Sequence, residues 1–210
     1  MDACDGVITV TGVDSDNGGS GCADNPRIIT RTWTFENSCG NTVSVDQEIA
    51  IIDNVPPTAD LIPSENLSCS SLIPTPDPNV VTGEMDNCGI TPTVTLFGVS
   101  SDGSGCNSDP LVVVHTYAVT DANCNTAYIH HLFTVVDNTP PTFNAPPNIT
   151  IHVDENCLFD DSPATTGDIS DVNDNCGSML NASYSDNIIP GINPQEKFII
   201  LRTWYLEDGC

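Results

Sequence analysis

The chain has 210 residues and a formal net charge of −25, because 29 acidic side chains stand against four basic ones. This charge repels the phosphates of nucleic acids and of anionic lipids, so we expect no nucleic acid among the partners. No apolar run approaches the ~18 residues of a membrane-spanning helix, so direct membrane insertion is not expected either. Ten cysteines indicate disulfide bonds and an oxidising, extracellular compartment.

The sequence repeats itself with a period of 84 residues. The stretch 31–58, RTWTFENSCGNTVSVDQEIAIIDNVPPT, returns without a gap as 115–142, HTYAVTDANCNTAYIHHLFTVVDNTPPT, and a third copy of the motif begins at Arg202. A fixed period of this kind is typical of a tandem array. We therefore expect a segment of a longer chain, in which a signal peptide is neither expected nor recognisable. It comprises the C-terminal part of a first copy, a complete middle copy, and the N-terminal part of a third copy without its last strand: residues 1–53, 54–137 and 138–210.

Two strands joined by a turn are expected in the first copy. Residues 28–35 are rich in β-branched and aromatic side chains, and residues 42–52 alternate between apolar and polar ones. Alternation with a period of two is typical of a half-buried antiparallel strand. The polar segment 36–41 between them predicts a hairpin turn. Residues 14–19 resemble part of an EF-hand loop but lack its closing glutamate, so we expect only a turn there.

The middle copy is expected to be built from several short strands. The candidates are residues 59–69, 80–82, 91–99, 111–120 and 127–137. The last of these carries an apolar set that repeats the first copy position by position, namely Ala127, Ile129, Phe133 and Val135. Short strands separated by turn residues are typical of an antiparallel sandwich, so the predicted fold class is all-β.

Strand geometry suggests which cysteines pair. A strand of ten residues spans ~33 Å, whereas the Cα atoms of a disulfide lie within about 7 Å. Cys106 and Cys124 flank the strand 111–120 and are therefore not expected to bond. The expected bonds are Cys69–Cys106, Cys88–Cys124, Cys4–Cys39 and Cys176–Cys210, which leaves Cys22 and Cys157 without partners. The competing scheme pairs sequence neighbours, Cys69 with Cys88 and Cys106 with Cys124.

Several motifs of the repeat resemble those of a known group of proteins. They are DNCG at 86–89, DGSGC at 102–106, a strand beginning HTY or RTW, a CGNT-type turn and VVDNTPPT at 135–142. Together they resemble the tandem repeats of very large Bacteroidota cell-surface adhesins, the SprB type of gliding-motility adhesin among them, and related HYR-type repeats. The chain departs from the family motif at Asn125, where the family has glycine, and the third copy lacks one cysteine.

This resemblance implies a fold and a role. The implied fold is a series of tandem immunoglobulin-like antiparallel β-sandwiches arranged as an extended rod. The implied role is adhesion or gliding motility at the bacterial cell surface, after export by the type IX secretion system. The expected function is thus a structural repeat segment of a secreted adhesin fibre. Its partners would be the neighbouring repeats of the same chain and an unknown surface or glycan ligand.

Carboxylate and amide side chains gather where consecutive copies are expected to meet. The candidate metal ligands are Asp53, Asn54, Glu84, Asp86, Asp121, Asp137, Asn138, Asp171, Asn173, Asp174 and Asp208. Ca²⁺ takes six to eight oxygen ligands and would reduce the repulsion between like charges, so calcium is the expected cofactor at these places. Residues 171–175 also resemble the DxNDN calcium motif of cadherins. The alternative interpretation is a solvated acidic rim with Asx-turns.

Two other functions stay open at this level, and catalysis is not expected. The first is a carbohydrate- or polymer-binding module with contacts on loops 14–21, 100–108 and 183–195, and the second is an accessory module of a secreted hydrolase. His130 and His131 are neighbours on a strand and point to opposite faces, so they cannot act together. One repeat position is always aromatic, which indicates a core residue rather than a platform for sugars; its members are Trp33, Tyr117 and Trp204.

Overall fold

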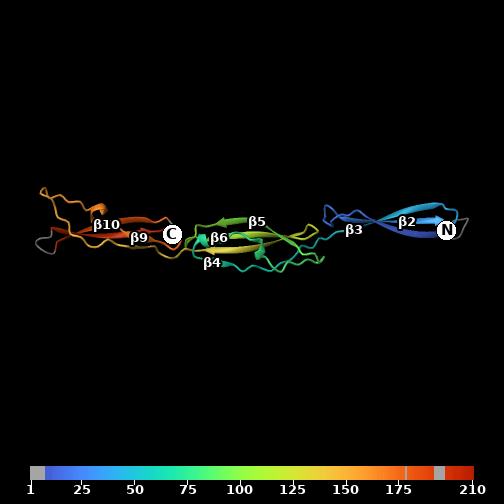
Figure 1. The fold of residues 1–210 in the computed structure, drawn as a ribbon, viewed down its shortest axis with the longest axis horizontal. Helices are drawn as coiled ribbons and strands as arrows, with labels where there is room; N and C mark the ends of the chain where they lie inside the picture. Colours follow the sequence, from blue (N-terminus) through green and yellow to red (C-terminus); the bar gives the residue numbers. More distant parts are fainter. Residues whose placement is uncertain (1–7, 178, 192–196) are drawn as a thin grey trace. The chain divides into compact units, whose positions relative to one another are not determined.

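The computed structural model describes residues 8–177, 179–191 and 197–210 (Figure 1). These residues are mostly β-strand, with two 3₁₀ turns and one short α-helix, which confirms the all-β fold class. The chain divides into two compact units, and the division runs through the middle copy. Unit 1 holds Met1–Pro63, Pro76–Ser100 and Val114–His131, and unit 2 holds Ser64–Thr75, Ser101–Val113 and Leu132–Cys210.

Among the helices of the described residues, none has the length and apolar character needed to cross a membrane.

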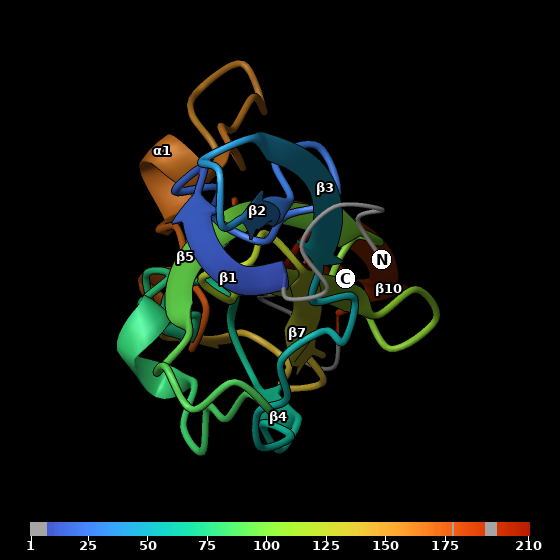
Figure 2. The same ribbon diagram turned by 90° about the vertical axis from the view of Figure 1, so that its right-hand side faces the viewer.

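Unit 1 begins with a three-stranded antiparallel sheet in which β2 lies between β1 and β3 (Figures 1 and 2). The strands are β1 (Ile8–Asp16), β2 (Arg27–Asn37) and β3 (Thr42–Ile51). The last two confirm the predicted strands, whereas β1 was not expected. Asp14 and Asp16, which suggested part of a calcium loop, lie on β1 and form ion pairs with Arg31 and Arg27 of β2. Cross-strand pairing therefore decides the conformation of this segment.

The middle copy contributes a four-stranded sheet in the order β4-β7-β6-β5. Its strands are β4 (Glu65–Leu67), β5 (Thr93–Asp102), β6 (Leu111–Thr120) and β7 (Thr126–Val135). β4 runs parallel to β7, with Leu67 opposite Val135. Of the apolar set predicted on the last strand, Ile129, Phe133 and Val135 are buried and Ala127 is half-buried.

Two extended segments, residues 58–62 and 81–85, cover one face of this copy, and we call them the cover segments. Thr58 and Met85 exchange backbone hydrogen bonds of 2.8 and 2.9 Å, and the Asp60 amide donates to the Thr82 carbonyl at 2.8 Å. Their side chains pack on a buried cluster that consists of Val81, Tyr117, Val119 and Ile129, with Ala59, Ile62 and Val94 at its edge. The predicted strand over 80–82 is therefore wrong, and of the predicted strand over 59–69 only β4 forms. Prolines at 56, 57, 63 and 78 flank these segments and lack the N–H that a longer ladder needs.

Polar groups also occupy the buried face of the middle sheet. His115 and His131 are both buried, with ring centroids 6.4 Å apart, whereas His130 is exposed. The two adjacent histidines thus point to opposite faces, as predicted. Burial lowers the pKa of His115, and the nearby His131 lowers it further.

Unit 2 contains the third copy, which forms two small antiparallel sheets. β8 (Thr142–Asn144) pairs with β9 (Ser170–Asn173), and β10 (Asn181–Pro190) pairs with β11 (Phe198–Glu207). The helix α1 (Pro163–Thr166) precedes β9.

Arg202 connects the parts of this third copy. Its guanidinium donates to both carboxylate oxygens of Asp186, to Thr166 Oγ1 at 3.0 Å and to the Asp161 carbonyl at 2.7 Å. It also lies 4.2 Å from the ring centroid of Tyr184. These contacts hold the segment around α1 against the sheet of β10 and β11.

The aromatic repeat position is buried to different degrees in the three copies. Tyr117 is fully buried, which confirms the predicted core role in the middle copy. Its hydroxyl accepts a hydrogen bond from the Asp77 amide at 3.2 Å and so anchors the proline-rich loop. Trp204 is half-buried and Trp33 is 36% exposed. The same residue type at one repeat position therefore becomes core only where a second layer covers it.

Candidate functional site

Three disulfide bonds connect cysteines that belong to different copies of the repeat. The bonds are Cys22–Cys124, Cys69–Cys176 and Cys106–Cys210, with Cα atoms 5.3, 5.1 and 5.0 Å apart. The partners are separated by 102, 107 and 104 residues, which is more than one repeat in every case. We call the surroundings of the first bond the first joint, which lies in unit 1, and those of the other two the second joint, which lies in unit 2.

Three of the four predicted disulfide bonds are wrong. The bonds not formed are Cys69–Cys106, Cys88–Cys124 and Cys176–Cys210, and neither bond of the competing neighbour scheme is formed. Cys22, expected to lack a partner, has one, while the expected partner of Cys39, Cys4, lies outside the described residues. The prediction assumed that each copy is closed by its own cysteines. In the structure the turn at one end of a sheet bonds instead to a loop of the preceding copy.

Part of the reasoning about cysteines is nevertheless confirmed. Cys106 and Cys124 do not bond each other, as the length of β6 between them requires. Cys88 and Cys157 form no disulfide with any described residue, and for Cys157 this was expected.

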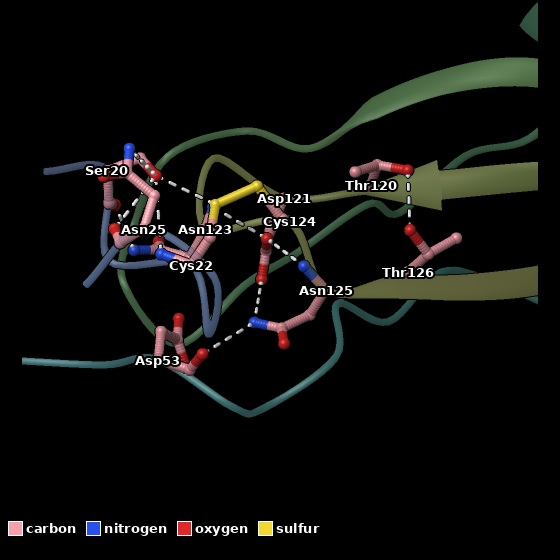
Figure 3. The surroundings of a disulfide bond; sticks show 10 residues. All are labelled: Ser20, Cys22, Asn25, Asp53, Thr120, Asp121, Asn123, Cys124, Asn125 and Thr126. Carbon is pink, nitrogen blue, oxygen red and sulfur yellow. Dashed lines mark hydrogen bonds between the residues drawn. A yellow bond between two sulfur atoms is a disulfide. The ribbon is translucent and has the colours of Figure 1, made fainter.

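The first joint is held by hydrogen bonds as well as by its disulfide (Figure 3). Cys22 is fully buried, in a loop closed by a bond from the Gly21 amide to the Asn25 carbonyl at 3.1 Å. Asn123 Nδ2 donates to the Ser20 carbonyl at 2.9 Å, which ties the turn of the middle copy to this loop. The two copies are therefore joined by hydrogen bonds around the sulfur atoms as well as by the disulfide.

Asp121 organises the turn that carries Cys124. Its Oδ1 accepts from the amides of Asn123 and Asn125 at 2.8 Å each, and its Oδ2 accepts from Asn125 Nδ2 at 2.8 Å. The same Asn125 side chain donates to the Asp53 carbonyl at 3.3 Å, across the joint (Figure 3). Asp121 is thus the buried acceptor of an Asx-turn, in line with the alternative interpretation of the acidic residues.

The register of this turn explains why Cys124 aligns with Gly40 rather than with Cys39. Cys124 has a φ of 72° and Gly40 has a φ of 82°, so both occupy the left-handed region. A turn of this shape requires one left-handed residue, which is usually glycine. In the middle copy the cysteine itself takes that position.

Asp53, Asp86 and Cys88 meet beside the first joint. The Cys88 thiol donates to Asp53 Oδ2 at 3.0 Å, and the Cys88 amide donates to Asp86 Oδ2 at 2.8 Å. The thiol hydrogen bond lowers the pKa of Asp53. The same bond raises the pKa of Cys88 to about 11, with burial and the charges of Asp53, Asp86 and Asp121 acting in the same direction. Asp86 Oδ1 is buried and has no hydrogen-bond partner among the described residues.

The second joint reproduces this arrangement. The Asp137 amide donates to the Gly105 carbonyl at 2.7 Å, as the Asp53 amide does to the Gly21 carbonyl at 3.2 Å. The Cys176 amide donates to an Asp174 carboxylate oxygen at 2.8 Å, the distance found between Cys88 and Asp86. The repeat in sequence is therefore a repeat of joint geometry.

The two joints differ in one bond. Cys176 stands where Cys88 stands in the first joint, but it bonds Cys69, and the Asn175 amide lies 3.1 and 3.4 Å from the two sulfur atoms. Counting bonds between described residues, the second joint is thus closed by two disulfides and the first by one.

In the part of the chain that the structure describes, two groups of side chains in the joints could hold a metal ion. The groups are Asp53, Asp86 and Cys88, and Asp137, Asp174 and Cys176, whose candidate ligand atoms lie within 4.8 Å of one another in each group. Cys176 is in a disulfide, so its sulfur is not an anionic ligand. The groups therefore share a pair of carboxylates, which suits a cation that prefers oxygen.

The other predicted carboxylate ligands lie outside these two groups; they are Glu84, Asp121, Asp171 and Asp208. The predicted amide ligands are Asn54, Asn138 and Asn173. Asp208 Oδ1 accepts from the Cys210 amide at 2.7 Å, and Asp171 accepts from the Asn144 side chain at 2.6 Å. Asn173 lies opposite Thr142 in the β8–β9 sheet, so the cadherin-like stretch 171–175 is mainly strand. The predicted ligand set is thus partly brought together and partly used in turns and sheets.

No protein-family model matches the chain, and no curated protein matches it. The three disulfides agree with the predicted oxidising environment, extracellular or secreted.

Proposed function

We propose that the chain is a structural segment of a secreted, surface-exposed fibre, built from tandem immunoglobulin-like β-sandwich repeats that follow one another as an extended rod. The observation that carries the proposal is that the three disulfides found among the described residues all connect different copies. In a small binding domain or enzyme, disulfides usually close loops within the domain that they stabilise. Here they connect each repeat covalently to the next, as expected for a tandem array whose repeats must stay together.

The disulfides also give the chain a short covalent path. From Cys22 the path crosses to Cys124, returns along β6 to Cys106 and crosses again to Cys210. Under tension, only the stretch from Cys106 to Cys124 can lengthen, to about 60 Å at ~3.4 Å per residue. Without the disulfides, the chain from Cys22 to Cys210 would extend to about 640 Å at the same rise. A limit of this kind supports a role in transmitting force.

Single-molecule stretching between the two ends of the chain tests this role. With the disulfides intact, we expect the extension between Cys22 and Cys210 to stop roughly tenfold short of the value reached after reduction with a phosphine. Cys157→Ser should stretch like the parent chain, because Cys157 lies outside the covalent path. Full extension of the oxidised chain would contradict the proposed mechanical role.

The location that we propose is the outer surface of a bacterium, with adhesion or gliding motility as the task and type IX secretion as the route. The disulfides, the acidic charge and the resemblance of the repeat motifs support it. An antibody against residues 54–137 should label intact, non-permeabilised cells of the source bacterium. Labelling that requires permeabilisation would argue against a surface fibre.

The structure offers little support for the alternative, a carbohydrate- or polymer-binding module. The loops suggested for ligand contact contain Gly21 and Gly105, whose carbonyls accept hydrogen bonds from Asp53 and Asp137 inside the joints. Residues 192–196 of the third loop lie outside the described residues. A glycan array separates the two functions, because a structural segment should bind none of the glycans and a binding module should select a defined set.

Calcium is the ion that we propose for the paired carboxylates of the joints. The buried Asp86 Oδ1 without a hydrogen-bond partner supports the proposal, because a desolvated carboxylate oxygen is costly unless a donor or cation satisfies it. Calorimetric titration with Ca²⁺ should give a binding signal at millimolar concentration or below, and Asp86→Asn should weaken it. Asp208→Asn, which removes a charge outside both groups, is the matched control. A silent titration of the parent chain would remove calcium from the proposal.

A further inference from the structure

The sheet of the first copy has an apolar face that no described residue covers. Trp33 and Val45 are 36% and 58% exposed, whereas Tyr117 and Ile129, at the same repeat positions of the middle copy, are 1% and 8% exposed. In the middle copy the cover segments pack on this face. The first copy therefore has the same apolar face, but among the described residues it has no equivalent of the cover segments.

The same sheet has an unpaired edge. Within the described residues β3 pairs only with β2, whereas its counterpart β7 also pairs in parallel with β4. The Val136 amide, just beyond β7, donates to the Leu67 carbonyl at 3.0 Å, and Ile52 at the same repeat position has no such acceptor among the described residues. The edge of β3 can thus accept a strand in the register that β4 shows.

Cys88 lies where that added strand would lead. In the second joint the chain continues from β4 to Cys69, which bonds Cys176. Cys88 occupies the repeat position of Cys176, with the same backbone hydrogen bond to an aspartate and a neighbouring asparagine amide 3.6 Å from its sulfur. Cys157 occupies the repeat position of Cys69, and it too bonds no described cysteine.

We propose that the first copy is an acceptor site for an extended segment of a preceding copy in the same polypeptide, equivalent to residues 54–84. The strand of that segment pairs in parallel with β3, its cover segments close the face over Trp33, and its cysteine bonds Cys88. Cys157 is the corresponding donor for a following copy. In this way the first joint acquires the second disulfide that the second joint already has.

The bond forms by oxidation of two thiols. Cys88 and the incoming cysteine together lose two protons and two electrons, and a disulfide oxidant such as oxidised glutathione is reduced to two thiols. This inference rests on the tandem-repeat part of the proposed function and not on adhesion. The experiment below measures whether the disulfide forms. Its negative result would therefore be distinguishable from a negative result in the stretching or cell-labelling experiments, which test the proposed function.

The test extends the full chain with a copy of residues 54–84 placed directly before Met1, where the period of the repeat puts such a segment. The copied Cys69 then precedes Cys88 by a separation within the range of the three observed bonds, 102 to 107 residues. After folding with reduced and oxidised glutathione, non-reducing peptide mapping should show the copied cysteine bonded to Cys88. Maleimide labelling of Cys88 should fall at least tenfold while that of Cys157 persists, and tryptophan emission should shift to shorter wavelength as Trp33 is covered.

Two matched variants separate docking from cross-linking. Replacing the copied Cys69 by serine should keep the shift in emission but restore the labelling of Cys88. Replacing the copied Ile62 and Leu67 by aspartate should abolish both effects, because these side chains are placed to pack on the sheet and to pair with its edge. Full labelling of Cys88 in the extended chain would overturn the proposal. A disulfide between Cys88 and Cys157 of two chains, formed in preference to the bond within the extended chain, would overturn it as well.

Discussion

The first and second joints have the same backbone geometry but different numbers of disulfides. In both, an aspartate amide at the end of a strand donates to a glycine carbonyl of the preceding loop. In both, a cysteine amide donates to an aspartate carboxylate at 2.8 Å. In the second joint that cysteine bonds another cysteine, whereas in the first joint it bonds none that the structure describes. The comparison teaches that the polar framework of a joint forms without its second disulfide, so this bond reinforces the interface rather than creating it.

The largest expected difference between the joints concerns the loss of one disulfide. Cys22→Ser should lower the free energy of unfolding by about 3 to 4 kcal/mol, because it removes the single bond that closes the long loop of the first joint. Cys106→Ser should cost only about half as much, because Cys69–Cys176 still closes a loop of similar length in the second joint. Urea denaturation of the two variants under oxidising conditions measures the difference. Equal losses would mean that the two disulfides of the second joint act independently.

The failure to predict these bonds has a physical reason. Cys22 and Cys106 share one repeat position, and Cys124 and Cys210 share another after the shift of one residue in the turn. Pairing within a copy and pairing between copies are therefore equally compatible with the spacing. The contacts of Asn123 with the Ser20 carbonyl and of Asn125 with the Asp53 carbonyl show which part of the preceding copy the turn faces, and no pattern in the sequence marks them.

The second prediction concerns the reactivity of Cys88, which has no counterpart in the second joint. With a pKa of about 11, the thiol is mostly protonated at pH 8, so alkylation by iodoacetamide should be slow and should accelerate about tenfold per pH unit up to that value. Asp53→Asn removes the carboxylate that accepts the thiol hydrogen bond and should speed alkylation at pH 8 by roughly tenfold or more. Mass spectrometry of the Cys88 peptide gives the rate, with Cys157 in the same sample as the control. An unchanged rate in the Asp53 variant would show that the carboxylate does not hold the proton on the sulfur.

Strands were easier to predict than the layer that covers them. β6 spans the predicted residues, since alternating and β-branched side chains mark a strand wherever both neighbours pair with it. The cover segments are extended but form only isolated backbone bonds, and prolines flank them. Their position depends on the apolar cluster around Tyr117, which is a property of the packed copy and not of any local pattern.

The sequence predicted which acidic residues are candidates for the site, but not which of them come together. Some of the predicted carboxylates do meet in pairs, because the acidic residues at repeat ends share repeat positions. Asp53 meets Asp86, and Asp137 meets Asp174. Asp121 and Asp208 are used instead as acceptors in turns. A carboxylate that faces a ligand and one that caps a turn look alike in sequence, since the same residue types favour both.

The third prediction compares these two turn aspartates. Asp121 is buried and accepts three hydrogen bonds, whereas a single bond from the Cys210 amide is found at Asp208. Asp121→Ala should therefore lower the free energy of unfolding by about 2 kcal/mol, and Asp208→Ala by about 1 kcal/mol or less. Asp121→Asn keeps an acceptor oxygen and should recover part of the loss. Chemical denaturation of the three variants checks the order, and an equal effect of both alanine variants would contradict the structural role given to Asp121.

The smallest expected difference concerns the glycines at equivalent positions of the two joints. Gly21 and Gly105 have φ values of 88° and 96°, so alanine at either position should cost about 1 kcal/mol of backbone strain. A Cβ on Gly21 would also lie 2.5 Å from Asn123 Nδ2, the group that donates to the Ser20 carbonyl. A Cβ on Gly105 would meet only Leu111 Cβ, at an ordinary 3.7 Å.

Gly21→Ala should therefore destabilise the chain by about 1 kcal/mol more than Gly105→Ala, since it displaces a hydrogen bond of the first joint. Adding Asn123→Ala to each glycine variant sharpens the comparison, because the extra loss should disappear at Gly21 and stay absent at Gly105. If Gly21→Ala and Gly105→Ala proved equally destabilising with Asn123 intact, the Asn123 amide would contribute nothing to holding the first joint. The joint would then depend on its disulfide and on the hydrogen bonds that Asp53 makes with Asn125 and Gly21.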